Sequence, residues 1–345
     1  MSHGTVLHLF GWDKKFVLPF RNFIHKHFTD DCHKFIIYGS VEESEVPSST
    51  DTVVYKSLLK NIFVLSMQMH KAEKIILHGM FNSRLFYILL IQPWVLKKCY
   101  WVIWGGDLYV HEAPAKDWRW RKNDFFRHQV IKRLGHFVTQ VSGDYELAKS
   151  WYGARGKYHE CFMYPSNLYK KYEITPKDHK TINIQIGNSA DPTNNHIDAL
   201  EKLLIHKDKN IKIFVPLSYG SRDHATKVIE FGEMEFGDMF QPMSDFMPFE
   251  KYIEFLAEID IALFNHRRQQ AMGNATTLLG IGKKVYMRSD VTSWTFLKKL
   301  GVTVFDIERF DLTLLSEAQV NENRRVVSNY FSETNLVKQL EGLFQ

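Results

Sequence analysis

The sequence predicts an α/β protein made of two doubly wound domains that face a cleft. Patterns typical of strands and helices alternate along almost the whole chain, which favours parallel sheets with helices on both faces. The chain has 345 residues. That length exceeds one ordinary core and suits two domains of roughly 150–180 residues each. The alternation stops over residues 166–180, where lysines, polar residues and Pro176 follow one another without periodicity. This segment is therefore predicted to be the linker.

The elements of each domain follow from hydrophobic alternation and helical spacing. In the first domain, residues 1–165, strands are expected at 5–10, 35–39, 52–55, 74–78, 99–103 and 136–141, and helices at 15–27, 57–72, 82–91, 117–134 and 144–151. In the second domain, residues 181–320, strands are expected at 182–186, 212–216, 259–264, 284–287 and 303–305, and helices at 195–206, 222–233, 249–258, 274–281 and 292–300. Residues 321–345 are expected to form helices that pack back on the first domain.

Composition places the chain among soluble globular proteins, with 45% hydrophobic and 24% charged residues. The net charge of +5 does not demand nucleic acid, but it suits an anionic substrate or an anionic membrane surface. Cys32, Cys99 and Cys161 lie far apart and are typical of free thiols in a reducing compartment. The first residues resemble a strand rather than a signal peptide, and no apolar run is long enough to span a bilayer. We therefore expect a cytoplasmic protein that can attach to a membrane surface.

Three turns of the second domain directly follow predicted strands, where a doubly wound sheet binds its ligands. The first turn is polar and leads into a helix that Asn194 or Asn195 can cap, which makes it a candidate anion site. The third turn combines arginines with a helix start, and guanidinium groups and unpaired amides both favour a diphosphate. Each turn could instead be an ordinary connection. The expected donor-binding residues are Gly187, Asn188, Ser189, Tyr219, Arg268, Gln269, Gln270, Gly273, Asn274 and Thr276.

Two residues of the first domain are candidates for acid–base chemistry. His78 ends a predicted strand before a glycine and has an ordinary pKa suited to proton transfer. Asp107 follows two glycines that allow a close turn, and its carboxylate could act as general base on a sugar hydroxyl. The alternatives are a semi-buried structural histidine and an aspartate that caps a turn. The expected acceptor-binding residues are Trp12, Asp13, Asn82 and Trp104.

Basic and aromatic side chains alternate at helical spacing over residues 116–133. This stripe is a candidate membrane-surface patch, although such stripes also bind nucleic acid or pack an aromatic face on a core. The chain has no His-Glu-x-x-His and no Asp-x-Asp sequence, so we expect neither a metal nor a cofactor.

Four segments resemble the 4-alpha-L-fucosyltransferase family, glycosyltransferase family 56. They are His78-Gly-Met-Phe-Asn82, Trp101-Val-Ile-Trp-Gly-Gly-Asp-Leu-Tyr109, Ile186-Gly-Asn-Ser189 with Asn195-His196, and Arg268-Gln-Gln270 with Gly273. The resemblance spans about residues 5–310. It implies a GT-B fold of two Rossmann-like domains, metal-independent inverting transfer, and peripheral association with the cytoplasmic face of the inner membrane. The family's known type transfers Fuc4NAc from TDP-Fuc4NAc to lipid II in enterobacterial common antigen synthesis.

The function expected from residues and resemblance together is transfer of a 6-deoxyhexose-type sugar, Fuc4NAc or fucose, from a TDP- or GDP-linked donor to a lipid-linked saccharide. Asp107 is the first candidate for the general base and His78 the second. Nucleic acid is not an expected partner of such an enzyme. Two alternatives stay open: a basic nucleic-acid-binding protein, and a non-catalytic GT-B partner in a glycan-assembly complex.

Overall fold

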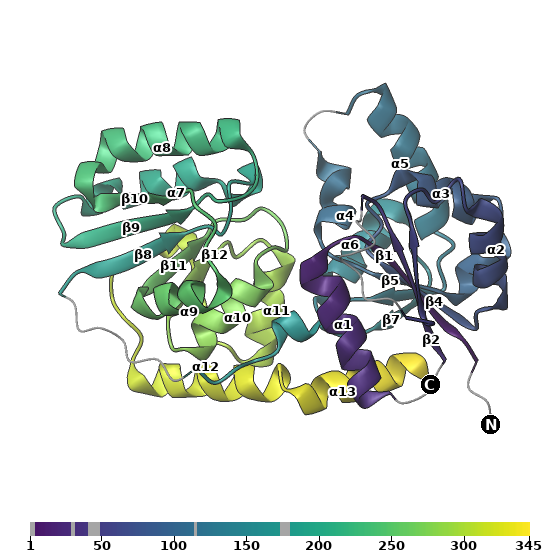
Figure 1. Ribbon diagram of the computed structural model, residues 1–345. Helices are drawn as coiled ribbons and strands as arrows, with labels where there is room; N and C mark the ends of the chain where they lie inside the picture. The colour runs from purple at the N-terminus through teal and green to yellow at the C-terminus, as the bar shows by residue number, and fades with distance from the viewer. Residues whose placement is uncertain (1–3, 29–31, 41–48, 114–115, 173–179) are drawn as a thin grey trace. The chain divides into compact units, whose positions relative to one another are not determined.

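A computed structural model describes the chain except for residues 1–3, 29–31, 41–48, 114–115 and 173–179. The chain divides into two compact units, one formed by Met1–Leu168 with Glu333–Gln345 and the other by Tyr169–Ser332. Each unit contains one sheet of parallel strands with helices around it (Figure 1). The predicted fold class, α/β with two doubly wound sheets, is thereby confirmed.

The first unit has a seven-stranded sheet in the order β3-β2-β1-β4-β5-β6-β7. In its centre, Leu9 pairs with Ile36 on one side and with Leu77 on the other. The central strands are almost continuously buried, as expected for a parallel sheet covered on both faces. The strands are β1 (Val6–Gly11), β2 (His33–Tyr38), β3 (Thr52–Tyr55), β4 (Lys74–His78), β5 (Cys99–Val102), β6 (His136–Val138) and β7 (Lys157–His159).

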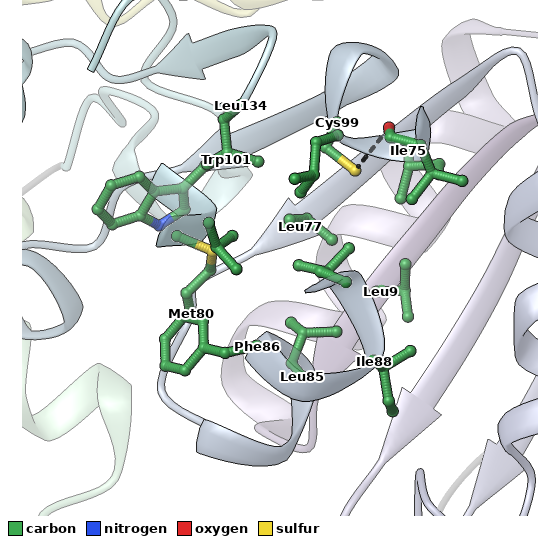
Figure 2. Packing of buried hydrophobic residues seen from close by; sticks show 14 of the residues in the cluster. Leu9, Ile75, Leu77, Met80, Leu85, Phe86, Ile88, Cys99, Trp101 and Leu134 are labelled. Atoms are coloured by element: carbon green, nitrogen blue, oxygen red, sulfur yellow. Dashed lines mark hydrogen bonds between the residues drawn. The ribbon is translucent and has the colours of Figure 1, made fainter. Parts of the chain in front are cut away.

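Helices cover both faces of this sheet. Its helices are α1 (Lys14–His27), α2 (Ile62–Lys71), α3 (Ser83–Leu90), α4 (Gly106–Tyr109), α5 (Trp118–Ile131), α6 (Ser142–Tyr152) and α13 (Glu333–Phe344), with short 3-10 turns η2 (Pro93–Lys98), η3 (Val110–Glu112) and η4 (Pro165–Asn167). Residues of α2, α3, α5 and α6 pack with the strands in one apolar cluster. Figure 2 shows part of this cluster, where Leu85 and Phe86 of α3 face Leu77 and Met80.

The opposite face of the sheet carries α1 and α13, and Lys26 near the end of α1 lies 2.6 Å from Glu333 at the start of α13. The ring of His8 meets Phe20 of α1 at 5.5 Å and Phe344 of α13 at 5.9 Å between centroids. Because side chains alternate along a strand, His8 points to this face while Leu7 and Leu9 point into the apolar cluster. This second face therefore carries buried histidines among aromatic side chains.

The second unit has a six-stranded sheet in the order β10-β9-β8-β11-β12-β13. Ile186 at the end of β8 pairs with Leu263 of β11. The strands are β8 (Ile182–Ile186), β9 (Ile211–Pro216), β10 (Phe240–Met243), β11 (Ile261–Phe264), β12 (Lys284–Met287) and β13 (Phe305–Asp306). The helices are α7 (His196–Leu203), α8 (Arg222–Phe236), α9 (Phe249–Glu258), α10 (Met272–Gly280), α11 (Thr292–Leu300) and α12 (Glu317–Tyr330), with 3-10 turns η5 (Pro192–Asn194), η6 (Leu204–His206), η7 (Gly237–Met239) and η8 (Ile307–Arg309).

Several local features differ from the sequence-based expectations. The edge strands β7 and β10 were not expected, and α4 occupies a place where only a turn was expected. The helix expected from residue 57 begins at Ile62, because the side chain of Asn61 donates to the Ser57 carbonyl and closes a turn before it. Within the expected linker, residues 173–179 lie outside the described part of the chain. Of the last two helices, α12 belongs to the second unit and α13 to the first.

In the part of the chain that the structure describes, no helix combines the length and the apolar composition needed to cross a bilayer.

Candidate functional site

Gly187 directly follows β8 in the second unit and has a left-handed backbone, with φ of 65°. A Cβ atom at this position would lie 2.7 Å from Asn194 Oδ1 and 2.7 Å from His196 Nε2. Glycine therefore lets the start of α7 approach the end of the strand. The Gly187 amide donates to the Leu263 carbonyl at 2.9 Å, and the Asn188 amide donates to Asn194 Oδ1 at 3.0 Å. Two amides expected to face a ligand are thus used inside the unit.

Asn194 is the hub of this turn and is fully buried. Its Oδ1 also accepts from His266 Nε2 at 2.8 Å, while its Nδ2 donates to Ser189 Oγ at 3.3 Å. Since the amide oxygen can only accept, we assign the His266 proton to Nε2. Burial, with the nearby Arg268 charge as a smaller contribution, lowers the pKa of His266 to about 3, so this ring is neutral at pH 7. Ser189 and His266 are thus buried, uncharged partners of Asn194.

Polar side chains from three different βα turns meet at the carboxyl edge of this sheet. Asn188 Nδ2 donates to the Tyr219 hydroxyl at 3.0 Å, and Gln270 Nε2 donates to Asn188 Oδ1 at 3.3 Å. The Thr193 hydroxyl oxygen lies 2.7 Å from Gln270 Oε1. Tyr219 is 57% exposed. The structure therefore brings together Asn188, Tyr219 and Gln270 at the carboxyl edge of the sheet.

Helix α10 begins at this edge without a side-chain cap among the described residues. Ala271 occupies the N-cap position in a left-handed conformation, with φ of 55°, and the first bond inside the helix runs from the Ala275 amide to the Ala271 carbonyl at 2.9 Å. The amides before Ala275, including that of Gly273, belong to the first turn, where helix amides have no partner inside the helix and the dipole is positive. The Thr276 hydroxyl donates to the Met272 carbonyl inside the helix at 2.9 Å. The helix start itself is a site suited to an anion.

Arg268 supplies a positive charge in the same turn. Its guanidinium lies 3.7 Å from Asp191 Oδ2 and donates to the Gln269 carbonyl at 3.4 Å. Burial opposes ionisation of Asp191, but hydrogen bonds from Thr193 and the Arg268 charge hold the pKa of Asp191 below its ordinary value. Asn274, in the first turn of α10, accepts from the Tyr252 hydroxyl at 3.2 Å. Arg268 and the α10 start therefore lie within one short stretch after β11.

The expected acceptor residues of the first unit follow three neighbouring strands, β1, β4 and β5. Asp13 and Asn82 cap helices, with side chains that accept from the amides of Lys15 and Arg84, both at 3.0 Å. Trp104 is half-buried, and its indole Nε1 donates to the Tyr164 hydroxyl at 2.8 Å. Trp12 is also half-buried.

Asp107 lies in α4 and is 2% exposed. Its Oδ2 accepts from the Met80 amide at 2.9 Å and from Trp101 Nε1 at 2.7 Å, and its Oδ1 accepts from the Trp104 amide at 2.9 Å. Burial raises the pKa of Asp107 above its ordinary value, although these donors oppose the rise. The carboxylate ties the segment after β4 to the turn after β5.

His78 is 3% exposed and belongs to a buried polar chain. Its Nδ1 lies 2.8 Å from the Tyr164 hydroxyl and its Nε2 lies 3.1 Å from His8 Nδ1. Phe10 stacks on the ring at 3.5 Å between centroids. Burial holds the pKa of His78 well below its ordinary value, so the ring is neutral at pH 7.

Sequence reasoning missed Tyr164 and His8, although a histidine between leucines in the first strand was a signal that it could have used. The basic and aromatic stripe over residues 116–133 divides in the structure. Trp118 is 69% exposed and Phe125 is also exposed. Trp120 Nε1 instead donates to the Val110 carbonyl at 2.9 Å. Among the described residues, no group of three or more His, Cys, Asp or Glu side chains is placed to hold a metal ion.

Comparisons with known proteins agree on fold and family. The profile of the family described as 4-alpha-L-fucosyltransferase glycosyl transferase group 56 matches residues 6–334. Among solved structures, HepE of Anabaena in complex with UDP and glucose is similar with a TM-score of 0.67 and 13% identity, covering 99% of both chains. A glycosyltransferase of Rickettsia africae gives a TM-score of 0.65 and 12% identity, covering 100% of this chain and 98% of its own. WaaG, a glycosyltransferase involved in lipopolysaccharide biosynthesis, gives a TM-score of 0.57 and 14% identity, covering 98% of this chain and 94% of its own.

The two parallel sheets, each with its helices, thus have the GT-B fold. Since the family profile spans nearly the whole length, the chain is a glycosyltransferase and belongs to the 4-alpha-L-fucosyltransferase family, glycosyltransferase group 56.

Proposed function

We propose that this glycosyltransferase moves a 6-deoxyhexose-type sugar from a nucleoside diphosphate to a lipid-linked saccharide in bacterial surface polysaccharide synthesis, with inversion at the anomeric carbon. TDP-Fuc4NAc is the first candidate donor and GDP-fucose the second, while lipid II of enterobacterial common antigen is the first candidate acceptor. Family membership supports the sugar class. The structures of HepE with UDP or UDP-glucose support a nucleotide sugar as the donor class.

The observation that carries the proposal is the uncapped start of α10, with Arg268 in the turn that leads into it. As the bond from the anomeric carbon to the diphosphate breaks, negative charge grows on the leaving oxygen. First-turn amides and a guanidinium stabilise that charge without a metal ion. The hydroxyls of the nucleoside or the sugar then form hydrogen bonds with Asn188 and Tyr219. Gln269, Gln270 and the segment from Gly273 to Thr276 complete the proposed donor site.

The proton of the attacking acceptor hydroxyl must pass to a base while the new glycosidic bond forms. Asp107 and His78 were predicted for this role, but both are buried and hold neighbouring groups. We propose that they position this edge of the first unit and that Asp13, which is half-buried after β1, takes the proton. Turnover of Asp13→Asn, Asp107→Asn and His78→Gln decides among them. Near-normal turnover by Asp13→Asn would rule Asp13 out.

Attachment to the cytoplasmic face of the inner membrane is proposed through Trp118 and Phe125 with the basic residues around them. Sedimentation with vesicles containing phosphatidylglycerol measures this directly. Binding should fall in Trp118→Ala and rise with the anionic lipid fraction. Salt-sensitive binding to DNA, without binding to vesicles, would instead indicate that this patch binds nucleic acid.

The donor proposal is tested by thermal shift with TDP-Fuc4NAc, GDP-fucose and UDP-glucose. A ligand at about 100 times its Kd stabilises the native state by about 2.7 kcal/mol, so a true donor raises the melting temperature. Arg268→Ala should abolish the shift, whereas Arg267→Ala, an exposed arginine of the same turn, should keep it. A shift that survives Arg268→Ala contradicts the site. Binding without transfer or donor hydrolysis would favour a non-catalytic partner.

A further inference from the structure

A continuous chain of buried polar side chains crosses the α1 side of the first sheet. His33 Nδ1 lies 2.9 Å from His8 Nε2, and His8 Nδ1 lies 3.1 Å from His78 Nε2. His78 Nδ1 lies 2.8 Å from the Tyr164 hydroxyl, which accepts from Trp104 Nε1 at 2.8 Å. The chain thus runs from β2 through β1 and β4 to the carboxyl edge of the sheet, where it ends on the one member that is not buried.

The direction of these hydrogen bonds follows from the donor at the end of the chain. An indole Nε1 can only donate, so the Tyr164 oxygen accepts from Trp104, and we assign the Tyr164 proton to the bond with His78 Nδ1. A neutral His78 then carries its proton on Nε2 and donates to His8, which donates in the same way to His33. In this arrangement each ring of the chain has one fixed tautomer. The Tyr164 hydroxyl is consequently locked in place rather than free to rotate.

Trp104, whose indole donates to the Tyr164 hydroxyl, is part of an aromatic cluster. Trp104 meets Phe16 at 4.6 Å and Phe81 at 6.0 Å between ring centroids, both edge to face. Phe81 is 59% exposed. The backbone of Trp104 is fixed separately, since its amide donates to Asp107. Backbone and indole are therefore held by two independent groups, which pre-organises the ring.

We propose that Trp104, Phe16 and Phe81 form a platform for a sugar ring of the acceptor, and that Tyr164, held by the chain His78–His8–His33, is the residue that positions the Trp104 indole. The apolar face of a sugar ring packs on an aromatic ring, and a rigid ring binds with less loss of freedom. The proposal rests on the transferase function above, in which the first unit takes the acceptor. It adds Tyr164 and the histidine chain as positioning residues.

The first sheet provides a matched control. His136 Nδ1 lies 2.9 Å from His159 Nε2, and His136 stacks on Tyr100 at 3.9 Å between centroids. This pair lies on β6 and β7, and within the described part of the chain it makes no hydrogen bond or ring contact with Trp104, Phe16 or Phe81. His136→Gln removes an imidazole from the same sheet without touching the platform.

The test measures binding of octyl β-glycosides of glucose, galactose and N-acetylglucosamine to the full chain by calorimetry. We expect at least one glycoside to bind, with affinity reduced at least about 10-fold in Trp104→Ala and about 10-fold in Tyr164→Phe, the size of one lost hydrogen bond. Trp104→Phe, which keeps a ring but lacks the donor, should behave as Tyr164→Phe does. His136→Gln should bind as the wild type does.

A second readout follows the hydrogen bond itself. In protein labelled with ¹⁵N-tryptophan, the indole resonance assigned by Trp104→Phe should shift and exchange faster with solvent in Tyr164→Phe, while it stays in place in His136→Gln. Unchanged glycoside binding in Tyr164→Phe, or no binding by the wild type, overturns the proposal. Nucleoside diphosphate binding to the same variants should be unaffected. If the wild type does not bind nucleoside diphosphate, the donor function is refuted, whereas the proposal for the aromatic platform is unaffected.

Discussion

Replacing Asp107 by asparagine separates a positioning carboxylate from a catalytic one. The carboxylate accepts three hydrogen bonds, from the amides of Met80 and Trp104 and from Trp101 Nε1, at 2.7–2.9 Å. An asparagine has one acceptor oxygen and one NH₂ group. In its best orientation the asparagine oxygen still accepts from the Met80 amide and from Trp101 Nε1. Its NH₂ group then faces the Trp104 amide, and because both groups are donors no hydrogen bond forms there.

The expected loss of stability follows from these bonds. The stranded Trp104 amide costs about 1–3 kcal/mol, and two bonds that lose their charge cost about 1 kcal/mol each. Asparagine is neutral and avoids the cost of burying a charge, which offsets part of this sum. The expected net loss of unfolding free energy is about 2–4 kcal/mol. A domain of this size loses roughly 2–4 °C per kcal/mol, so the melting temperature should fall by roughly 4–16 °C.

The assay is thermal unfolding of the wild type, Asp107→Asn and Asp117→Asn, followed by turnover at a temperature where all three are folded. Asp117 caps α5 through its side chain, and asparagine caps helices as well, so this control should unfold like the wild type. Refutation would be an Asp107→Asn protein that melts within about 1 °C of the wild type and has lost all turnover. That pair of results would assign the carboxylate to the chemistry.

Three further predictions concern the second unit. Gly187→Ala places a Cβ 2.7 Å from both Asn194 and His196 at a left-handed φ, so urea unfolding should show a loss of about 2–4 kcal/mol. Burial lowers the pKa of His196 and of His266 to about 3, so the unfolded chain binds more protons below pH 6.5. Stability should therefore fall as pH drops, by at most about 2 kcal/mol per histidine between pH 6.5 and 5, and equal urea midpoints at both pH values would contradict this. Arg268→Ala should weaken nucleoside diphosphate binding at least about 10-fold, as calorimetry would show.

The fold could be predicted from the sequence because its signals are local. Alternating apolar residues mark strands such as β8, and helical spacing marks the helices between them. The short edge strands β7 and β10 lack such a pattern, and β10 even contains Pro242, which a sheet tolerates at an edge.

The candidate site could be predicted only in part, because its signals are partly long-range. The turns carrying Asn188, Tyr219 and Gln270 were found by their place after strands. The chain from His8 to His78 and Tyr164 joins residues 70 and 86 positions apart, and nothing local announces such contacts. The bonds that occupy Asp107 were equally hidden, since three donors come together only when β4 and β5 lie side by side.

The most direct test of the central claim is release of nucleoside diphosphate by the purified chain. The protein is incubated with TDP-Fuc4NAc or GDP-fucose, a bacterial lipid extract as acceptor source, and EDTA. The account predicts that one donor releases its diphosphate in step with sugar appearing on lipid, and that Arg268→Ala abolishes both while Arg267→Ala retains them. Neither release nor transfer from any nucleotide sugar, with or without EDTA, would contradict it.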